Sequence, residues 1–237
     1  MILYQPKDGY CYNSDTHFLF NFICQNLKQF KNIHGELLDI GSGSGILGLL
    51  VARDFDKLNL NQVEVQEEFQ FLSQKNANIN KINNNLYKGD FLDISFDKQL
   101  DYIVSNPPFY PSCVVQSGNE NKKIARYNDN LPLENFIAKV SKILTPKGKF
   151  FFCYDVKLLN DIIITCKKHH LNIESVQFLH PNHKKEASLV MIMARKSSKT
   201  MMKILPPAIM FDELGEFDKA TNDIYDLCAT HSIKCEV

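Results

Sequence analysis

The residues best suited to chemistry follow the apolar segment Tyr102–Ser105 and read Asn106-Pro107-Pro108-Phe109. The Asn106 side-chain carbonyl and the Pro107 main-chain carbonyl are two acceptors that can bind both N–H bonds of an amine or amide. Consecutive prolines fix φ and favour extended geometry before each proline, which holds the second carbonyl in place. The Phe109 ring can stack on a planar base. This set suits methyl transfer to an exocyclic or amide nitrogen; the alternative is an Asn-Pro turn that only ends a strand.

A glycine-rich segment lies about sixty residues upstream. Gly41, Gly43 and Gly45 follow a short apolar segment, at a predicted strand-to-helix turn where the backbone must approach a ligand closely. The spacing of Gly43, Gly45 and Gly48 also matches the dinucleotide fingerprint, and Glu64 lies about 20 residues further on, where a ribose-binding carboxylate is expected. The glycines alone therefore leave two cofactor classes open.

Three observations favour S-adenosylmethionine over a dinucleotide. Because the turn begins at Gly41, Gly48 falls inside the following helix, where a packing role suffices. Asp39 places a carboxylate beside the loop, which suits an ammonium group and repels a pyrophosphate. Asp90 and Phe91 follow the third predicted strand, where a carboxylate can accept from an adenine amine while the ring covers the base. Surface acidic residues at strand ends are the alternative interpretation of Glu64 and Asp90.

The charge is unevenly distributed along the 237 residues, although it sums to zero. Residues 1–109 have a net charge of −4, residues 110–210 carry 16 Lys and Arg against 7 Asp and Glu, and residues 211–237 have a net charge of −5. A basic middle can build one positive face for phosphates. Ordinary solvated lysines on helices are the alternative.

Composition points to the cytoplasm. The sequence has no run of 18 apolar residues, and its first residues do not resemble a signal peptide. Its seven cysteines are odd in number and lack CxxC spacing, so we expect reduced thiols. No His, Asp or Glu grouping has metal-ligand spacing, so no metal is expected.

Predicted strands and helices alternate along the chain. Strands are expected over 36–40, 62–65, from 86, and over 101–105, 149–154, 173–179 and 189–194; helices over 15–29, 46–55, 68–80, 133–144 and 156–169. This alternation predicts an α/β fold with a seven-stranded, doubly wound Rossmann-like sheet, mostly parallel with one antiparallel strand. The chain divides into an N-terminal extension (1–35) packed over the cofactor end, the main domain (36–210) and an acidic C-terminal tail (211–237).

Two basic segments are candidate substrate contacts. Residues 110–131 form a long polar connection, which in compact domains is typical of functional lids or disordered segments, and its Lys122, Lys123 and Arg126 can clamp a substrate. His180, Lys184 and Lys185 lie between the last two predicted strands and can contact phosphates or bases. A solvated hairpin is the alternative for the second segment.

The sequence as a whole resembles the class I S-adenosylmethionine-dependent methyltransferases with an NPPF motif, and more closely the bacterial tRNA1(Val) (adenine-37-N6)-methyltransferase family. The resemblance rests on QPKDGYCYNSD, DIGSGSGILGLL, VEVQEE, GDF, SNPPFY, IARYN, HPNHKKEASLVMIMARK and ILPP. It implies cofactor contacts at Gly41, Gly43, Gly45, Glu64 and Asp90, with Asn106 serving both the cofactor and the substrate. The family's His-Glu pair after Ala-Arg is replaced here by Tyr127-Asn128.

The predicted function is therefore cytoplasmic methylation of a tRNA adenine amine, with tRNA as partner and S-adenosylmethionine as cofactor. Methylation of a glutamine in a release factor uses the same Asn-Pro-Pro geometry and is the nearest rival, against which the basic 110–210 region speaks. DNA adenine methylation is less favoured because the chain has no room for a target-recognition domain. A non-catalytic RNA-binding module is the remaining alternative.

Overall fold

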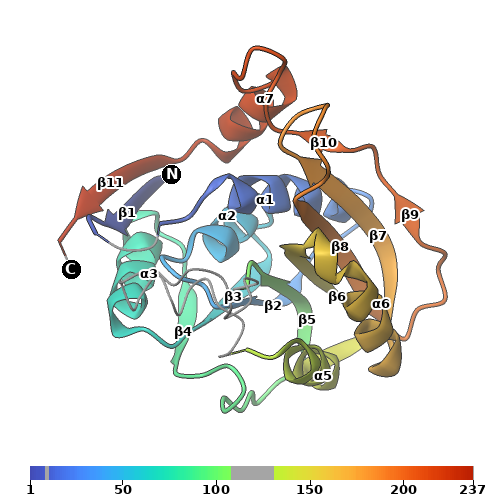
Figure 1. Ribbon diagram of the computed structural model, residues 1–237. Helices are drawn as coiled ribbons and strands as arrows, with labels where there is room; N and C mark the ends of the chain where they lie inside the picture. Colours follow the sequence, from blue (N-terminus) through green and yellow to red (C-terminus); the bar gives the residue numbers. More distant parts are fainter. Residues whose placement is uncertain (9–10, 108–130, 237) are drawn as a thin grey trace.

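The computed structural model describes residues 1–8, 11–107 and 131–236. In this part of the chain, nine strands form one sheet in the order β10-β7-β8-β6-β5-β2-β3-β4, with β9 beside β7 (Figure 1). The strands are β2 (Gly35–Ile40), β3 (Leu58–Glu64), β4 (Asn84–Lys88), β5 (Leu100–Ser105), β6 (Leu144–Asp155), β7 (Leu171–His180), β8 (Leu189–Lys196), β9 (Lys203–Ile204) and β10 (Ala208–Ile209).

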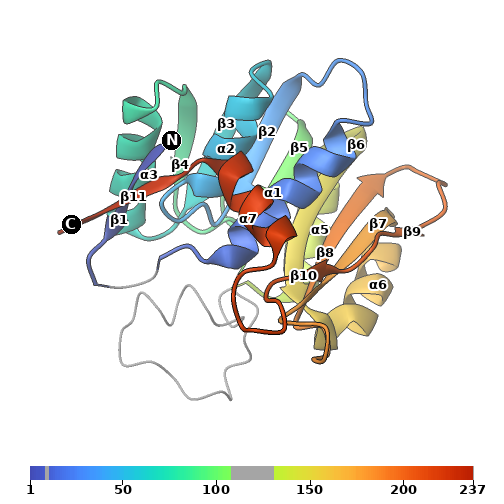
Figure 2. The same ribbon diagram turned by 90° about the horizontal axis from the view of Figure 1, so that it is seen from above.

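Helices cover both faces of this sheet. They are α1 (Ser14–Leu27), α2 (Ile46–Asp54), α3 (Glu67–Ile79), α5 (Leu133–Ile143) and α6 (Leu159–Lys168), the last preceded by the short 3₁₀ helix η2 (Val156–Leu158). The first three lie on one face, and α5 and α6 lie on the other (Figure 2). This two-sided cover explains why the central strands are almost wholly apolar: both faces of β5 and β6 are buried, with Ile103, Phe151 and Phe152 all at 0% exposure.

The α/β class and the single antiparallel strand are confirmed. Strand β8 runs antiparallel to β6 and β7, and every other pairing in the main sheet is parallel among the residues that the structure describes. The strand count differs: the seven predicted strands are present, and β9 and β10 extend the sheet beyond β7. Each has only two residues, too few for the alternating pattern by which a strand is recognised in sequence.

The two ends of the chain meet. Strand β1 (Ile2–Pro6) pairs in parallel with β11 (His231–Cys235), which follows helix α7 (Lys219–Cys228), and together β1 and β11 form a separate two-stranded sheet (Figure 1). The segment expected as an acidic tail thus contains a helix and a strand. Helix α7 packs on α1, where the buried Ile224 and Cys228 side chains face the core.

Candidate active site

The carboxyl ends of β2 and β5 bring the glycine-rich turn beside Asn106. The last residues of the two strands, Ile40 and Ser105, are paired, and the Ser105 Oγ donates to the Ile40 carbonyl at 2.8 Å. Gly41 and Asn106 directly follow β2 and β5, so the two residues lie side by side at the edge of the sheet. A cavity of about 40 Å³ lies at this point, lined by side chains of β1, α1 and α3 as well as by Asp39, the glycine loop and Asn106.

The glycine loop leaves room for a ligand. Gly41, Gly43 and Gly45 have φ of 65°, 54° and 88°, a region that other residues rarely adopt. A Cβ at Gly41 or Gly43 would meet nothing within 4 Å, so the backbone faces open space there. Gly48 differs, because a Cβ would lie 2.9 Å from the Asp39 Cβ. Its role is close packing, which agrees with the sequence interpretation.

Two buried carboxylates flank the loop. Asp39 accepts from the Gly48 N–H at 2.8 Å, and burial raises its pKa to about 7. Burial also raises the pKa of Glu64, whose carboxylate accepts main-chain N–H groups of Gly43 (2.7 Å), Val65 and Gln66 (2.9 Å each). Glu64 therefore fixes the glycine loop to the end of β3.

Asp90 and Phe91 follow β4, on the far side of β3. The Asp90 carboxylate accepts from the Leu92 N–H at 2.8 Å. Phe91 is 5% exposed, and its ring meets that of Phe136 edge-on, 5.9 Å between centroids. Neither residue lines the cavity at the glycine loop, so a contact of either with a bound adenine stays a prediction.

The Asn106 amide is held at both ends. Its Nδ2 donates to the Thr16 Oγ1 at 3.1 Å, and its Oδ1 accepts from the Cys153 thiol at 2.9 Å. Burial raises the pKa of Cys153 well above its usual value, which keeps the thiol protonated and able to donate. Pro107 is buried directly behind Asn106. Four predicted site residues lie outside the described part of the chain: Phe109, Lys122, Lys123 and Arg126.

The residues around the cavity fit S-adenosylmethionine. Two buried polar atoms of the lining, Gln5 Oε1 and Ser42 Oγ, have no hydrogen-bond partner among the described residues. With Asp39 they offer polar groups for an amino-acid end, while Glu64 lies at the neighbouring strand. A cavity of about 40 Å³ is far smaller than a typical small-molecule site of roughly 300–1,000 Å³. The bond from the Gly43 N–H to the Glu64 carboxylate is a contact that a ribose could replace.

Three residues of this site could not be recognised from the sequence. Gln5 and Thr16 come from the N-terminal segment, and Cys153 comes from β6, more than forty residues beyond Asn106. No local spacing connects them to the two motifs. Only the pairing of β5 with β6 and the placement of β1 and α1 bring them to the site.

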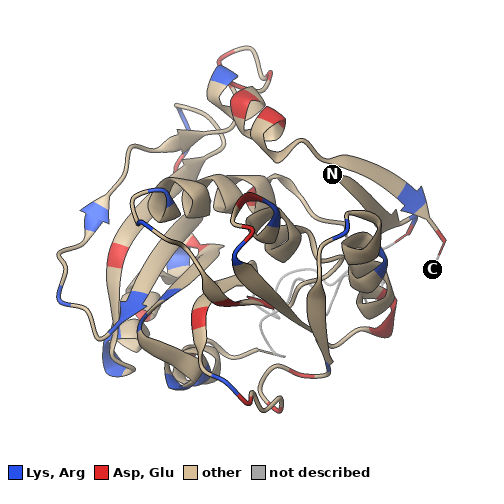
Figure 3. Cartoon of the chain, turned by 180° about the vertical axis from the view of Figure 1, so that it is seen from behind, with Lys and Arg blue, Asp and Glu red and all other residues tan. Residues whose placement is uncertain are grey.

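The basic residues are divided between two edges of the sheet. Residues 181–188 join β7 to β8, and the pairing of Leu179 and Asp155 with Leu189 places this turn at the carboxyl edge, the same edge as Asn106. Lys184 and Lys185 are exposed there, and His180 Nδ1 is 2.9 Å from the Lys185 carbonyl. A second basic group lies at the opposite, amino edge, around the ends of α5, α6 and β8 (Figure 3): Lys142, Lys147, Lys167, Lys168, Arg195 and Lys196. The described residues thus do not form one positive face.

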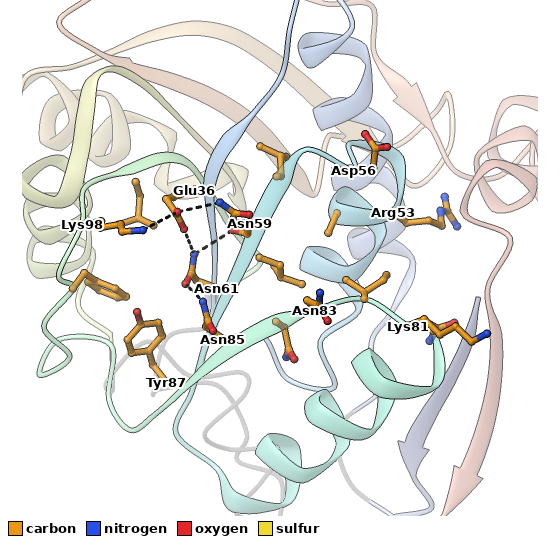
Figure 4. Close-up of a pocket in the computed structure, with 18 of the residues that line it drawn as sticks. Glu36, Arg53, Asp56, Asn59, Asn61, Lys81, Asn83, Asn85, Tyr87 and Lys98 are labelled. Atoms are coloured by element: carbon orange, nitrogen blue, oxygen red, sulfur yellow. Dashed lines mark hydrogen bonds and ion pairs between the residues drawn. The ribbon is translucent and has the colours of Figure 1, made fainter.

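A larger cavity is remote from this site. It measures about 850 Å³ and lies at the amino ends of β2, β3 and β4 (Figure 4). Its polar groups satisfy one another: Glu36 accepts from Asn59 (3.2 Å) and Asn61 (2.9 Å), and Asn85 donates to Asn61 at 3.2 Å. Ligands of open α/β sheets bind at the carboxyl ends of strands, so the smaller cavity remains the candidate site.

Metal ligands and membrane spans can be assessed over residues 1–8, 11–107 and 131–236. Within these ranges, no group of three or more His, Cys, Asp and Glu side chains could hold a metal ion. No helix of the described chain is long and apolar enough to cross a membrane.

Comparisons with known proteins agree with this geometry. A family model described as "Methyltransferase small domain" matches residues 17–170. A tRNA1(Val) (adenine(37)-N6)-methyltransferase from Pedobacter heparinus is 28% identical over 157 residues, 65% of this chain and 67% of the relative. One of the same name from Vibrio vulnificus is 30% identical over 119 residues, 49% of each chain. The alignments thus span about half to two thirds of these relatives.

Solved structures share the fold. A predicted O-methyltransferase from Agrobacterium tumefaciens superposes with a TM-score of 0.68 at 15% identity, covering 93% of this chain and 99% of the other. A 16S rRNA N2 G1207 methyltransferase from T. thermophilus, in complex with AdoMet and guanosine, gives 0.56 at 20% identity, covering 78% and 44%.

Proposed function

Because the chain belongs to the methyltransferase small domain family, we propose that it transfers a methyl group from S-adenosylmethionine to the exocyclic amine of an adenine in tRNA. The observation that carries the proposal is that a single cavity is lined by Asn106, by Asp39 and by the glycine loop. The names of the relatives support adenine-37 of tRNA1(Val) as the target.

The cofactor residues have separate roles in this proposal. Asp39 and the open backbone of Gly41 and Gly43 hold the amino-acid end, and Glu64 binds the ribose hydroxyls. Asp90 and Phe91 are the proposed contacts of the adenine ring. When bound, S-adenosylmethionine supplies a methyl group already activated by its positively charged sulfur.

The substrate residues act on the target nitrogen. The lone pair of an adenine amine is delocalised into the ring. Acceptance of its N–H bonds by the Asn106 Oδ1 and the Pro107 carbonyl would favour tetrahedral geometry and free that lone pair for attack. The proton is more acidic after methylation, so a dedicated strong base is not required. Stacking on Phe109 requires that the target base first be turned out of the anticodon loop.

The test is methyl transfer from labelled S-adenosylmethionine into unmodified total tRNA, followed by nucleoside analysis. We expect N6-methyladenosine in tRNA and no methylated glutamine when a release factor is offered instead. If the label appeared in the release factor and not in tRNA, protein-glutamine methylation would replace tRNA methylation as the proposed function.

The variant Asn106→Ala tests the proposed role of Asn106 in the same assay. It should lower turnover by about 10²-fold or more, as removal of a positioned hydrogen-bonding group does, and leave S-adenosylmethionine affinity within a few-fold of the wild type. Turnover close to that of the wild type would contradict the assigned role.

A further inference from the structure

The two chain ends form a small sheet that is built into the cofactor site. Strand β1 pairs along its whole length with β11, from Ile2 with His231 to Pro6 with Cys235. Main-chain bonds continue at both ends, since the Lys7 N–H donates to the Cys235 carbonyl and the His231 N–H donates to the Met1 carbonyl, at 2.8 Å each. One edge of β1 is thus fixed by residues more than 220 positions away.

Helix α3 fixes the other edge of β1 with side chains. Asn76 accepts from the Tyr4 N–H at 2.7 Å and donates to the Tyr4 carbonyl at 3.0 Å, as a neighbouring strand would. Asn80 makes the same two bonds with Ile2, at 3.1 and 2.6 Å. The Asn76 Nδ2 also donates to the Ser44 carbonyl at 2.8 Å. One asparagine therefore connects β1 to the glycine loop.

This anchoring buries Gln5 in the cavity. Its side chain is 1% exposed, and its Nε2 donates to the Ser44 Oγ at 2.6 Å. The other end of the amide, Oε1, is buried and has no partner among the described residues, and Gln5 belongs to the cavity lining together with Asp39 and Gly41. An unpaired buried acceptor destabilises a folded protein, so one retained beside a cavity indicates a ligand that pairs with it.

We propose that Gln5 binds the amino-acid end of S-adenosylmethionine and that the β1–β11 sheet is part of the cofactor site. The inference rests on the proposed function for its ligand. An ammonium group carries three donors: the Asp39 carboxylate and the Gln5 Oε1 can accept two of them. The Ser42 Oγ, unpartnered in the described part of the chain, lies in the same lining and can donate to the carboxylate of the amino acid.

The experiment measures affinity for two ligands by calorimetry: S-adenosylmethionine, and 5′-methylthioadenosine, which lacks the amino-acid end. Gln5→Leu should weaken S-adenosylmethionine binding by about 10-fold or more, the loss expected for a hydrogen bond to a charged group. Its affinity for 5′-methylthioadenosine should be unchanged. Gln25→Leu, at an exposed position of α1, is the matched control and should bind both ligands as the wild type does.

The possible failures are distinguishable. A wild type that does not bind S-adenosylmethionine overturns the proposed function. A wild type that binds it, with Gln5→Leu binding equally well, overturns the role of Gln5. Equal weakening of both ligands also overturns that role, because it would mean general damage to the site. Gln5→Asn, which keeps the amide but withdraws it by one methylene, gives a second variant if Gln5→Leu does not fold.

Discussion

At the scale of single residues, the amide of Asn106 is oriented by two neighbours. The Thr16 Oγ1 accepts from the Asn106 Nδ2, and the Cys153 thiol donates to the Asn106 Oδ1. One lone pair of the Asn106 carbonyl is therefore left for a substrate amine. A freely rotating amide would present its NH₂ half of the time. Thr16 and Cys153 are therefore expected to be positioning residues that act through Asn106.

Thr16→Val and Cys153→Ala should each lower kcat by about 3- to 10-fold, the value of one neutral hydrogen bond. The affinity for S-adenosylmethionine should stay within a few-fold of the wild type, because both bonds are made to Asn106, whose proposed main role is on the target nitrogen. Thr16→Ser keeps the hydroxyl and Cys153→Ser replaces the thiol by a hydroxyl donor, so both should restore kcat. Single-turnover kinetics with tRNA measure the effect; a loss in Cys153→Ala that Cys153→Ser fails to restore would indicate packing rather than positioning.

Asp39 gives the binding equilibrium a pH dependence. Burial raises its pKa to about 7, so the carboxyl group is half protonated near neutral pH. A cationic ammonium group favours the ionised form, and affinity for S-adenosylmethionine should therefore rise as pH increases through 7 and level off above it. Calorimetry across neutral pH tests this. Asp39→Asn should bind S-adenosylmethionine more weakly, and its affinity should no longer rise through pH 7. A pH profile identical to that of the wild type would assign the titration to another group.

At the scale of elements, β1 depends on β11 for its position. Ile233→Pro removes a main-chain N–H of β11 at the residue paired with Tyr4 and fixes φ. We expect faster hydrogen exchange in residues 2–6 and weaker S-adenosylmethionine binding, with the main sheet intact. Ile233→Val keeps the N–H and should behave as the wild type. Unchanged exchange and affinity in Ile233→Pro would show that α3 alone holds β1.

The elements that could be predicted from the sequence are those that carry their own pattern. Apolar runs indicated the central strands, such as β5 and β6, because burial on both faces of a sheet leaves a continuous apolar signal. The glycines after β2 indicated the first turn. Strand β1 lacked such a signal. Its sequence, Ile-Leu-Tyr-Gln-Pro, is short and ends in proline, and its partners are β11 and two asparagine side chains of α3.

The same limit applies to the site. Asp39, the glycines and Asn106 could be found because each follows or ends a strand of the main sheet, and parallel strands end at a common edge. Gln5, Thr16 and Cys153 could not, because they reach the site through packing between distant segments. The position of Phe91 after β4 indicated a ligand contact; its ring packs edge-on against Phe136, and the contact with adenine stays a prediction.

At the scale of the whole molecule, the position of each basic group relative to Asn106 decides which could touch tRNA. The turn between β7 and β8 lies at the carboxyl edge, whereas the second basic group, around the ends of α5, α6 and β8, lies at the amino edge. Acidic residues are frequent in α7 and in the segment before it, seen at the top of Figure 3: Asp212, Glu213, Glu216, Asp218, Asp223 and Asp226. Among the described residues of 110–210, the basic side chains named above thus form two separate groups.

Charge reversal can separate the two groups. Lys184→Glu with Lys185→Glu should weaken tRNA binding and reduce its salt dependence by about one unit of slope for each phosphate that the protein no longer neutralises. Lys142→Glu with Lys167→Glu makes the same change of charge at the amino edge and should leave both quantities unchanged. Binding isotherms at several salt concentrations give the answer; equal weakening in both double variants would mean that only the overall charge matters.

The pairing of β1 with β11 also bears on how the protein is made. Residues 2–6 leave the ribosome more than 220 residues before residues 231–235, so during that interval β1 has no strand partner. The main sheet can form from β2 to β8 before β11 is available. During this time the unpaired edge of β1 is exposed to other nascent chains. Ability to bind the methyl donor would then arise only after β11 has emerged, and a chain cut short before β11 is expected to fold its core yet bind the donor weakly.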